Sequence, residues 1–562
     1  MVDRENNKAY RILKGNHLRK NVILSTVSGV ATTKEELVRL FDRSVKDVDI
    51  ITTKSFQTVP TTGNTPPVVV SPEEGDYGNS VGLRNPGMDY AFKYLGKLRN
   101  EGFSKILNIS LAASNVDDFI TLVKKFDPIA DMLELNFSCP HAAKGFGASI
   151  GSDENLIREY VESINKAYPE RKSLLIVKLS PNVPSIARMA EVAISSGADG
   201  VAAINTVGPR EYYLDGHEIL HNALGGKGGA SGEWVKDIAF DAIRDIRKRI
   251  GDEPIILSMG GMSRAEDVRK MIDLGADSVG IGSALSRIAP ENWDAYFTAL
   301  KNGGDVGKYF TLSHKNLEYE KHTVKGKIMY SDDIVVLTLD GKGTCKAGEF
   351  VFLFIPGLGE RPFSVAKNDP LSFIIRVKGP FTEGVKNIKQ GDEIYIRGLS
   401  GSPLSVKKAK KALLIAGGTG TVVLNLLAEE LKKNGTEMEF RIGMQELGSS
   451  GKGLMQDELE KYGKYEVVLD DGKPGRVLDT ISPSDISPDN AYYIVGPTVM
   501  MKKGAEKLLS LGAKAEEINI SVETMTMCGI GMCGECVVGS HLPCRQGTFL
   551  TWEYIAKNKV DF

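Results

Sequence analysis

The chain has 562 residues, more than one hydrophobic core organises, so its length predicts several domains. A hydrophobic content of 42% and a charged content of 25% are ordinary for a globular protein. The formal net charge of −2 gives no electrostatic reason to expect nucleic acid or a membrane as a partner. The charged first twenty residues argue against a secretory signal, and six cysteines in so long a chain do not suggest a secreted disulfide framework. We therefore expect a cytoplasmic protein.

Short apolar segments rich in Val, Ile and Leu recur along the first 300 residues. They are 21–27, 48–53, 105–111, 132–138, 174–180, 200–206, 254–261 and 278–284. Amphipathic stretches at helical spacing, such as TKEELVRLFDRSV and SIARMAEVAISSG, separate most of them. Eight β–α units whose strands read as buried on both faces predict an α/β fold with a (β/α)8 (TIM) barrel. An open doubly wound sheet is the alternative.

Polar residues and glycines follow several of these segments, at the carboxyl ends of the predicted strands, where a barrel of this kind carries its chemistry. They are Lys54, Ser55, Asn136, Ser138, Cys139, Lys178, Asn205, Thr206, Gly260, Gly261, Gly282 and Ser283. The glycines after the last two strands let backbone N–H groups approach a phosphate. The sequence therefore predicts one functional site at this end of the barrel.

Seven motifs then follow in order: KSFQTVPTTGNTPP, GNSVGLRNPG, LNFSCPH, KLSPNV, INTVG, GGASG and MGGM…GADSVGIGSA. Together, over about residues 10–300, they resemble the class 1 dihydroorotate dehydrogenases, flavoproteins that bind FMN on such a barrel. The resemblance implies an FMN site made by Ser28, Gly29, Lys54, Ser55, Lys178, Gly229, Gly260, Gly261, Gly282 and Ser283. It implies a pyrimidine site made by Asn79, Gly82, Leu83, Arg84, Asn136, His141, Asn205 and Thr206, whose amide and hydroxyl groups match the N–H and C=O edge of the ring.

The same resemblance assigns the chemistry to Cys139, Ser138, Lys54 and Lys178. Cys139 would be the general base that takes the C5 proton while hydride passes from C6 to the flavin, and Lys178 would lie near the N1/O2 edge of the flavin. A free thiol titrates near pH 8.5, roughly, which suits proton exchange at mildly alkaline pH. A buried structural cysteine is the alternative for Cys139. Its place in the polar sequence NFSCPH, on what should be a mobile glycine-rich loop, argues against that alternative.

The residue after the Cys–Pro pair leaves the substrate open. Dihydroorotate dehydrogenases usually carry Asn there, whereas this chain has His141, as dihydropyrimidine dehydrogenases do, and their substrates lack a carboxylate. The NSVGLRN loop and Arg84 favour a substrate with a carboxylate. We expect dihydroorotate; reduction of uracil or thymine with NAD(P)H is the alternative. A non-catalytic redox sensor or electron carrier is the alternative from another class.

The pattern of the sequence changes after residue 310. Short alternating segments between residues 324 and 397 predict a small antiparallel β-barrel, and KALLIAGGTGTVVLNLLAEELKKNG predicts a strand, a glycine turn and a helix of a nucleotide-binding α/β unit. RPFSV, GGTGT, DDG and GPTVMM occur in the order typical of the ferredoxin-reductase superfamily, and they resemble the electron-transfer subunit of NAD-dependent dihydroorotate dehydrogenase. The resemblance implies an FAD site at Arg361, Pro362, Phe363 and Ser364 and an NAD site at Gly417, Gly418, Gly420 and Gly496.

The segment CGIGMCGECVVGSHLPC places four cysteines at C-x4-C-x2-C-x7-C spacing. A zinc site favours two close pairs, and a disulfide framework does not suit a cytosolic chain. The C-x4-C-x2-C run is the plant-type spacing of a [2Fe–2S] cluster. The predicted ligands are Cys528, Cys533, Cys536 and Cys544, with the short gap before Cys544 unlike that of relatives. Cys345 is read as an ordinary turn residue.

These predictions give four domains: an FMN barrel (1–308), an FAD-binding β-barrel (309–408), an NAD-binding α/β domain (409–515) and a [2Fe–2S] domain (516–562). Residues 286–310 would bridge two proteins that relatives keep as separate subunits. Electrons would pass from FMN through [2Fe–2S] and FAD to NAD. We also expect a homodimer formed through the barrel, with no nucleic acid and no membrane as partner.

Overall fold

The computed structural model describes residues 6–17, 21–137, 148–312, 314–471 and 475–560. The chain divides into two compact units. The first comprises Met1–His314 together with Gly531–Glu535, and the second comprises Lys315–Ile530 together with Cys536–Phe562. Among the helices of the described ranges, none has both the length and the apolar character needed to cross a membrane.

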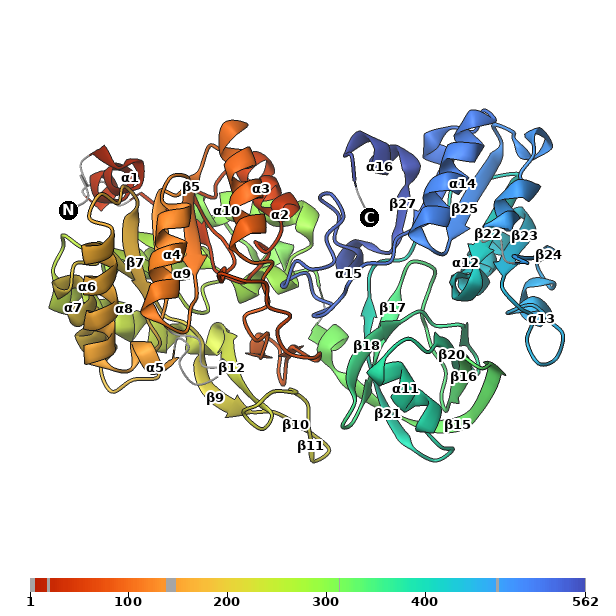
Figure 1. The fold of residues 1–562 in the computed structure, drawn as a ribbon, viewed down its shortest axis with the longest axis horizontal. Helices are drawn as coiled ribbons and strands as arrows, with labels where there is room; N and C mark the ends of the chain where they lie inside the picture. The colour runs from red at the N-terminus through yellow and green to blue at the C-terminus, as the bar shows by residue number, and fades with distance from the viewer. Residues whose placement is uncertain (1–5, 18–20, 138–147, 313, 472–474, 561–562) are drawn as a thin grey trace. The chain divides into compact units, whose positions relative to one another are not determined.

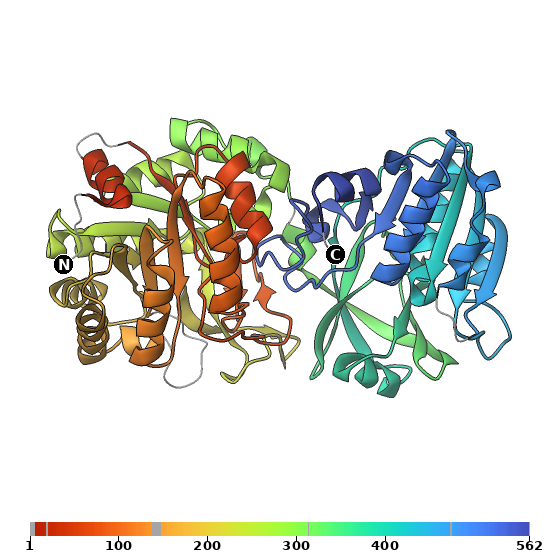
Figure 2. The same cartoon turned by 45° about the horizontal axis from the view of Figure 1, so that its top comes forward.

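The first unit is a closed barrel of eight parallel strands (Figures 1 and 2). Around the barrel the order is β1-β14-β13-β8-β7-β6-β5-β2, so each strand pairs with its neighbours along the chain and the last pairs with the first. The strands are β1 (Leu24–Thr26), β2 (Ile50–Thr52), β5 (Ile106–Leu111), β6 (Met132–Asn136), β7 (Leu174–Lys178), β8 (Gly200–Ala203), β13 (Ile255–Met259) and β14 (Ser278–Ile281). Each lies inside one of the eight apolar segments, so the predicted (β/α)8 barrel is confirmed.

Amphipathic helices surround the strands (Figure 2). They are α1 (Lys8–His17), α2 (Glu35–Ser44), α3 (Met88–Asn100), α4 (Val116–Phe126), α5 (Ala148–Gly151), α6 (Glu154–Ala167), α7 (Ile186–Ser195), α8 (Lys236–Ile250), α9 (Ala265–Asp273) and α10 (Trp293–Asn302). Helix α4 illustrates why they form. The side chain of Asn115 caps its first turn by accepting a hydrogen bond from the Asp118 N–H, and Phe119, Leu122, Val123 and Phe126 make one buried stripe.

The segment expected to bridge the two halves belongs to the barrel instead. Helix α10 falls within residues 286–310, and both lie in the first unit. Trp293, Tyr296, Phe297 and Leu300 are buried, and the Trp293 ring stacks on Phe41 of α2 at a centroid distance of 5.3 Å. The bridge prediction was therefore wrong, because this stretch buries the aromatic face of the last barrel helix.

The barrel interior changes from apolar to polar along the strands. Side chains of one strand alternate between the two faces, so Met132, Glu134 and Asn136 of β6 share a face. Met132 packs with apolar side chains from other strands in the interior cluster, whereas Glu134 and Asn136 are buried polar residues. The polar end is the carboxyl end of the strand, where the chemistry was expected.

A small antiparallel sheet adds residues to this end. It runs in the order β3-β4-β12-β9, with β3 (Val69–Val70), β4 (Asp76–Asn79), β9 (Val207–Glu211) and β12 (Lys227–Gly232). Strands β10 (Tyr213–Leu214) and β11 (His217–Glu218) form a separate hairpin. Pairing of β12 with β4 places Gly229 opposite Asn79.

The second unit begins with a seven-stranded antiparallel sheet in the order β18-β17-β21-β15-β16-β20-β19. The strands are β15 (Tyr319–Ser331), β16 (Ile334–Leu339), β17 (Phe350–Ile355), β18 (Gly359–Phe363), β19 (Lys367–Asn368), β20 (Leu371–Arg376) and β21 (Glu393–Ser400), with helix α11 (Pro380–Asn387). The long strand β15 pairs with β21 through its first half and with β16 through its second. One core cluster takes residues from both halves of this sheet. Among the described strands, β18 and β19 at its two ends do not pair with each other, so the sheet does not close into a barrel.

A six-stranded sheet follows in the order β24-β23-β22-β25-β26-β27, parallel except for β27. The strands are β22 (Lys411–Gly417), β23 (Glu437–Met444), β24 (Gly463–Leu469), β25 (Asn490–Val495), β26 (Ile518–Ser521) and β27 (Phe549–Thr551); the helices are α12 (Val422–Lys433), α13 (Gln456–Leu459), α14 (Thr498–Ser510), α15 (Pro543–Gln546) and α16 (Trp552–Lys557). Helices α12 and α14 pack on opposite faces, because each joins a different core cluster (Figure 1). This arrangement is typical of nucleotide-binding α/β domains.

Candidate functional site in the barrel

A cavity opens at the carboxyl ends of the barrel strands, and most of the residues predicted for the site surround it. The lining includes Ser28, Gly29, Lys54, Ser55, Asn79, Gly82, Leu83, Asn136, Lys178, Asn205, Thr206, Gly260, Gly261, Gly282 and Ser283. Hydrophobic side chains such as Val27, Ile204 and Met259 complete its wall. A cavity with apolar walls and a few convergent polar groups is the usual form of a small-molecule site.

Five predicted residues do not line this cavity or cannot be placed. Gly229 directly precedes Ala230, which lines the cavity, and the Gly229 carbonyl accepts a hydrogen bond from Asn79 Nδ2 at 3.2 Å. Arg84 lines a neighbouring pocket, where its Nη1 donates to the Thr62 carbonyl at 2.8 Å. Ser138, Cys139 and His141 lie outside the described residues, so their predicted roles stay predictions.

Two lysines give the cavity its charge. Lys54 is 8% exposed and Lys178 is 4% exposed, although lysine is among the residues least often buried. Lys54 reaches the first glycine of the site, with its Nζ 3.4 Å from where a Cβ on Gly29 would stand. Two buried ammonium groups in one cavity suit a ligand that carries negative charge or acquires it during the reaction.

The glycines after β13 are required by the backbone itself. Gly260 and Gly261 have φ values of +133° and +79°, a region that favours glycine. A Cβ on Gly261 would stand 2.4 Å from the Gly232 carbonyl oxygen, and a Cβ on Gly282, after β14, would stand 2.9 Å from Val27 Cγ2. The backbone therefore comes close to the cavity without side chains in the way, as a phosphate-binding turn requires.

Amide side chains form the polar part of the wall. Asn136 donates from Nδ2 to Ser55 Oγ at 3.0 Å, and Asn205 accepts from the Thr206 backbone N–H through Oδ1 at 2.9 Å. Asn79 is held by Gly229 across the small sheet. Each amide is thus oriented by a protein partner, as recognition of a heterocycle with alternating donors and acceptors requires.

Sequence reasoning missed several residues of this site, including Tyr77 and Ser231 in the cavity wall and Glu134 in the barrel beneath it. The Glu134 side chain is fully buried in the barrel, and its Oε1 lies 3.8 Å from Lys178 Nζ. The sequence did carry a signal, since Glu134 is the one charge in the apolar run MLELNFS. Burying a carboxylate is costly unless it is paired, so a charge inside a predicted barrel strand marks a special position.

The dihydroorotate dehydrogenase family model matches residues 12–294, about half of the chain. This chain belongs to the dihydroorotate dehydrogenase family. It is 36% identical to the catalytic subunit of dihydroorotate dehydrogenase B (NAD(+)) of Methanopyrus kandleri over 42% of this chain and 73% of that protein. It is 38% identical to dihydroorotate dehydrogenase A (fumarate) of Lactobacillus delbrueckii subsp. bulgaricus over 43% of this chain and 76% of that protein. Both relatives favour a dihydroorotate dehydrogenase over an enzyme of uncharged dihydropyrimidines.

A solved NADH-dependent reduced ferredoxin–NADP oxidoreductase, described for flavin-based electron bifurcation, shows a looser likeness. It covers 43% of this chain and 89% of its own chain at 23% identity, with a TM-score of 0.38. The match is too loose to argue from. What the second unit of this dihydroorotate dehydrogenase can bind therefore follows from its own residues.

The glycine turns of the second unit meet where two parallel strands end. Gly417 ends β22 and Gly496 follows β25, and a Cβ on Gly496 would stand 3.0 Å from the Gly417 backbone nitrogen. A Cβ on Gly420 would stand 2.8 Å from the Val495 carbonyl oxygen. These glycines are needed for the close packing of the two turns, and Gly418, at φ +55°, is the left-handed residue between β22 and α12. Helices α12 and α14 start directly after the turns, so both point their N-termini at the same edge of the sheet.

Arg361, Pro362 and Phe363 end strand β18, and Ser364 follows it. The Phe363 ring stacks on Phe381 of α11 at 6.0 Å, and the Arg361 guanidinium lies over the same Phe381 ring at 5.8 Å. Burial lowers the pKa of the Arg361 guanidinium. The predicted FAD residues are therefore grouped at one edge of the seven-stranded sheet.

Three of the four clustered cysteines are buried in the second unit. Cys528, Cys536 and Cys544 are at most 2% exposed, and the sulfur atoms of Cys536 and Cys544 are 3.3 Å apart. Contact with Cys536, together with burial, raises the pKa of the Cys544 thiol. Cys533 is partly exposed and lies in the segment grouped with the first unit. Over the described ranges no group of three or more His, Cys, Asp or Glu side chains is arranged to hold a metal ion.

Proposed function

We propose that this chain oxidises dihydroorotate to orotate at an FMN bound in the barrel cavity and passes the electrons through a [2Fe–2S] cluster and FAD to NAD. The single observation that carries the barrel half is the cavity, because two buried lysines, close-packed glycine turns and oriented amides meet at the strand ends of a dihydroorotate dehydrogenase barrel. Orotate and its reduced form present alternating N–H and C=O groups and a carboxylate, which these side chains complement.

The cavity residues fit FMN. Gly260, Gly261, Gly282 and Ser283 supply backbone without obstructing side chains for a phosphate, and Lys178 supplies a cation. FMN, when bound, supplies an acceptor for hydride from the substrate. The chain's own part is to hold the ring of the substrate through Asn79, Asn136, Asn205 and Thr206 and to remove one proton.

Proton removal belongs to Cys139 in this proposal, with Ser138 beside it. Both lie outside the described residues, but they directly follow Phe137 at the end of β6, next to Asn136 in the cavity wall. His141 is a further substrate residue in this proposal. Arg84, which was expected beside it, lines the neighbouring pocket and pairs with Glu535 at 3.1 Å, so its side chain is not directed at this cavity. The positions of Asn136 and Lys178, paired across β6 and β7, support chemistry at this end of the barrel.

The second unit is proposed as the electron relay. Its seven-stranded sheet, with Arg361, Pro362, Phe363 and Ser364, would hold FAD, and its six-stranded sheet, with Gly417, Gly418, Gly420 and Gly496, would hold NAD. A [2Fe–2S] cluster is proposed on the C-x4-C-x2-C spacing and on the close approach of the Cys536 and Cys544 sulfur atoms, 3.3 Å apart. A backbone N–H of Ile530 is also directed at Cys528 Sγ over 3.5 Å. The four ligands, the domain boundaries at 308, 408 and 515, and a homodimer through the barrel are parts of the same proposal.

The substrate is tested by anaerobic mixing of the purified protein with dihydroorotate, dihydrouracil or dihydrothymine, each followed by flavin absorbance. We expect bleaching by dihydroorotate alone. Bleaching only by an uncharged dihydropyrimidine would overturn the assignment in favour of a dihydropyrimidine dehydrogenase. Cofactor analysis should find about one FMN, about one FAD and about two irons per chain; absence of iron would remove the relay as proposed.

The base is tested by Cys139→Ser. A serine hydroxyl is a much weaker base than a thiolate, so reduction of the flavin by dihydroorotate should slow at neutral pH while flavin content stays unchanged. Reduction of the flavin by dithionite serves as the control, since it needs no base. An unchanged rate with dihydroorotate would show that another group takes the proton.

A further inference from the structure

Glu134 is the most deeply buried charged side chain at the site, and nothing in the proposed reaction uses it. It lies in the middle of β6, beside Ser110 of β5 and Ile176 of β7, and its exposure is 0%. Oε1 lies 2.8 Å from Ser110 Oγ and 3.8 Å from Lys178 Nζ. Oε2 has no hydrogen-bond partner within the described part of the chain.

A row of hydroxyl groups leads from Glu134 to the cavity wall. Ser110 Oγ lies 2.9 Å from Ser55 Oγ, which lies 3.0 Å from Ser28 Oγ and accepts from Asn136 Nδ2 at 3.0 Å. Ser28, Ser55 and Asn136 line the cavity. The row therefore joins the Glu134 carboxylate in the barrel core to the Asn136 amide, which is proposed to bind the substrate.

The carboxylate sets the direction of every bond in this row. Ser110 has one hydroxyl proton and donates it to Glu134, so the Ser55 hydroxyl must donate to Ser110. Ser55 then offers only lone pairs to its other partners, which selects the NH2 end of the Asn136 amide. If Ser110 did not need to donate to Glu134, Ser110 could donate to Ser55 and Ser55 could donate to Asn136. The Asn136 amide could then flip, so that its oxygen faced Ser55.

Lys178 depends on the same carboxylate. A buried lysine loses its proton readily unless an opposite charge lies nearby. Lys178 is 4% exposed, and Glu134 is the acidic group placed against it. A carboxylate alone in a barrel interior is unfavourable, so the two charges require one another.

We propose that Glu134 is the positioning residue of the cavity: it keeps Lys178 charged and in place, and through Ser110 and Ser55 it fixes which end of the Asn136 amide faces the substrate. This rests on the proposed function, because it assigns Lys178 to the flavin and Asn136 to the pyrimidine. Glu134 touches neither ligand and acts through its neighbours.

The two roles are separated by two variants. Glu134→Gln removes the charge but keeps an oxygen that can accept from Ser110, so it tests the hold on Lys178. Ser110→Ala keeps the charge but cuts the hydroxyl row, so it tests the hold on Asn136. Asp199→Asn is the matched control, because Asp199 is also a buried carboxylate of the barrel and is bound by Arg171 at 3.2 Å, but it precedes β8 at the opposite end of the strands.

The readout for Glu134→Gln is the midpoint potential of the barrel flavin against pH, measured with the full-length holoenzyme and redox dyes in the absence of substrate. In the variant, Lys178 should lose its proton at a lower pH than in the parent protein. While Lys178 is protonated, the potential of the variant should lie above that of the parent protein, because a negative charge near the flavin has been removed. As the pH rises and the unpaired Lys178 gives up its proton, the potential of the variant should fall and the difference from the parent protein should close. Lys54 and Tyr77, the other titratable residues of ranges 21–137 and 148–312 that line the cavity, are unchanged and cancel in the comparison. A profile identical to that of the parent protein would overturn the hold on Lys178.

The readout for Ser110→Ala is the affinity for orotate, measured by perturbation of the flavin spectrum. Loss of one oriented amide contact should weaken binding about fivefold, the scale of one neutral hydrogen bond, without changing the potential profile. Unchanged affinity would overturn the hold on Asn136. If Glu134→Gln does not fold, Ser110→Ala still decides whether the row holds Asn136. Glu134→Asp, which keeps the charge on a shorter side chain, then decides the hold on Lys178 by its potential profile. A parent protein that binds flavin but is not reduced by dihydroorotate would instead contradict the proposed function.

Discussion

Arg397 donates a hydrogen bond from Nη1 to the backbone carbonyl of Cys528 at 3.0 Å, so a fully buried guanidinium holds the first cysteine of the clustered segment. The same arginine makes a two-pronged ion pair with Glu360, through Nε at 2.9 Å and Nη2 at 2.6 Å. Gly401 and Ser402, which directly follow β21, hold the other end of the segment. The Gly401 N–H donates to the Cys544 carbonyl at 2.8 Å, and the Ser402 hydroxyl donates to the Arg545 carbonyl at 2.6 Å. The end of β21 and the turn after it therefore fasten both ends of the cysteine segment.

Arg397→Lys should loosen this segment. Lysine keeps the charge but cannot bind Glu360 with two parallel bonds and reach Cys528 at the same time. We expect a loss of stability of about 2 kcal/mol, the scale of one charge-assisted hydrogen bond, and faster loss of iron from the proposed cluster to a chelator. Arg441→Lys is the control, because Arg441 is a buried ion-pair partner in the same unit that is bound to Asp485. Equal iron loss in both variants would show that Arg397 has no particular hold on the segment.

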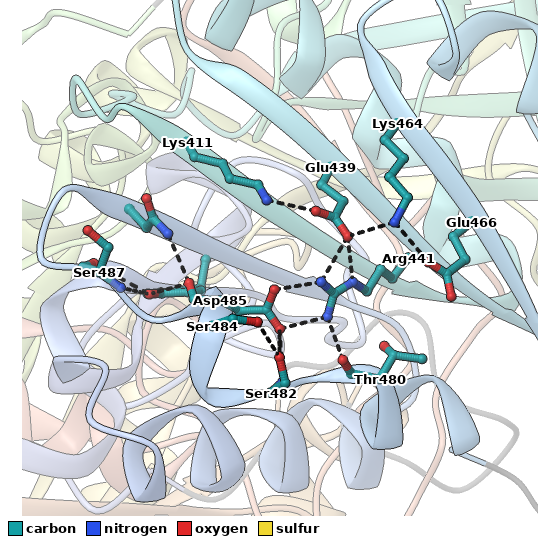
Figure 3. A network of polar contacts seen from close by, with 12 residues as sticks. Lys411, Glu439, Arg441, Lys464, Glu466, Thr480, Ser482, Ser484, Asp485 and Ser487 are labelled. Carbon is teal, nitrogen blue, oxygen red and sulfur yellow. Dashed lines mark hydrogen bonds and ion pairs between the residues drawn. The ribbon is translucent and has the colours of Figure 1, made fainter.

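Asp485 and Arg441 form the centre of a charged network on one face of the six-stranded sheet (Figure 3). Burial opposes ionisation of Asp485, but hydrogen bonds from Arg441 and from the Ser482 backbone outweigh it and lower the pKa of this carboxyl. A lowered pKa in the folded state stabilises the protein above the ordinary aspartate pKa of about 3.9, and this stabilisation is lost as pH falls through the lower folded value.

Asp485→Asn should therefore lower the thermal midpoint at neutral pH, because it leaves Arg441 without its main partner; a destabilisation of about 3 kcal/mol is the scale for such a pair. The difference between the variant and the parent protein should shrink as pH falls below about 4. Melting curves at pH 7 and at progressively lower pH test this. A difference that stays constant with pH would mean that Asp485 is protonated in the folded protein.

Gly261→Ala should empty the flavin site. The φ of +79° strains any side chain there, and the new Cβ would stand 2.4 Å from the Gly232 carbonyl, so the turn after β13 must move. Gly303→Ala is the matched control, since Gly303 has φ +74° but nothing within 4 Å of the new Cβ. We expect both variants to lose about 1 kcal/mol from backbone strain, and only Gly261→Ala to lose FMN on gel filtration. Retention of FMN by Gly261→Ala would remove this turn from the site.

Trp293→Ala should destabilise the barrel, because the segment from 286 to 310 packs as its last helix. The Trp293 side chain is 1% exposed, and its Nε1 donates to the Ile288 carbonyl at 3.2 Å. Truncation of a buried aromatic costs about 3–5 kcal/mol. Trp234→Ala, at a site that is 41% exposed, should cost much less. The melting points are measured by release of the barrel flavin on heating. Similar melting points for the two variants would contradict the assignment of this helix to the core.

The eight barrel strands could be predicted because each is an apolar run between amphipathic stretches, a pattern that local chemistry fixes. The cavity residues could be predicted because the carboxyl ends of parallel strands meet at one end of a barrel. Helix α10 was misjudged because its aromatic residues read equally well as a linker or a packed helix until Phe41, some 250 residues earlier in the chain, supplies the partner. In the second unit, alternation predicted the antiparallel strands, but it does not reveal which strands pair at the ends of a sheet.

The sequence by itself determined the barrel, the order of the parts and much of the lining of the cavity over the described residues, since strand periodicity, glycine turns and residue order are properties of the chain. Only the tertiary structure decided what supports the site. Glu134 and Ser110 become neighbours through the register of β5 and β6, and Arg397 reaches Cys528 across 131 positions of sequence. Such pairs carry no local pattern, because a buried charge is stabilised by whatever the fold brings within a few ångströms of it, and distance in space is set by packing.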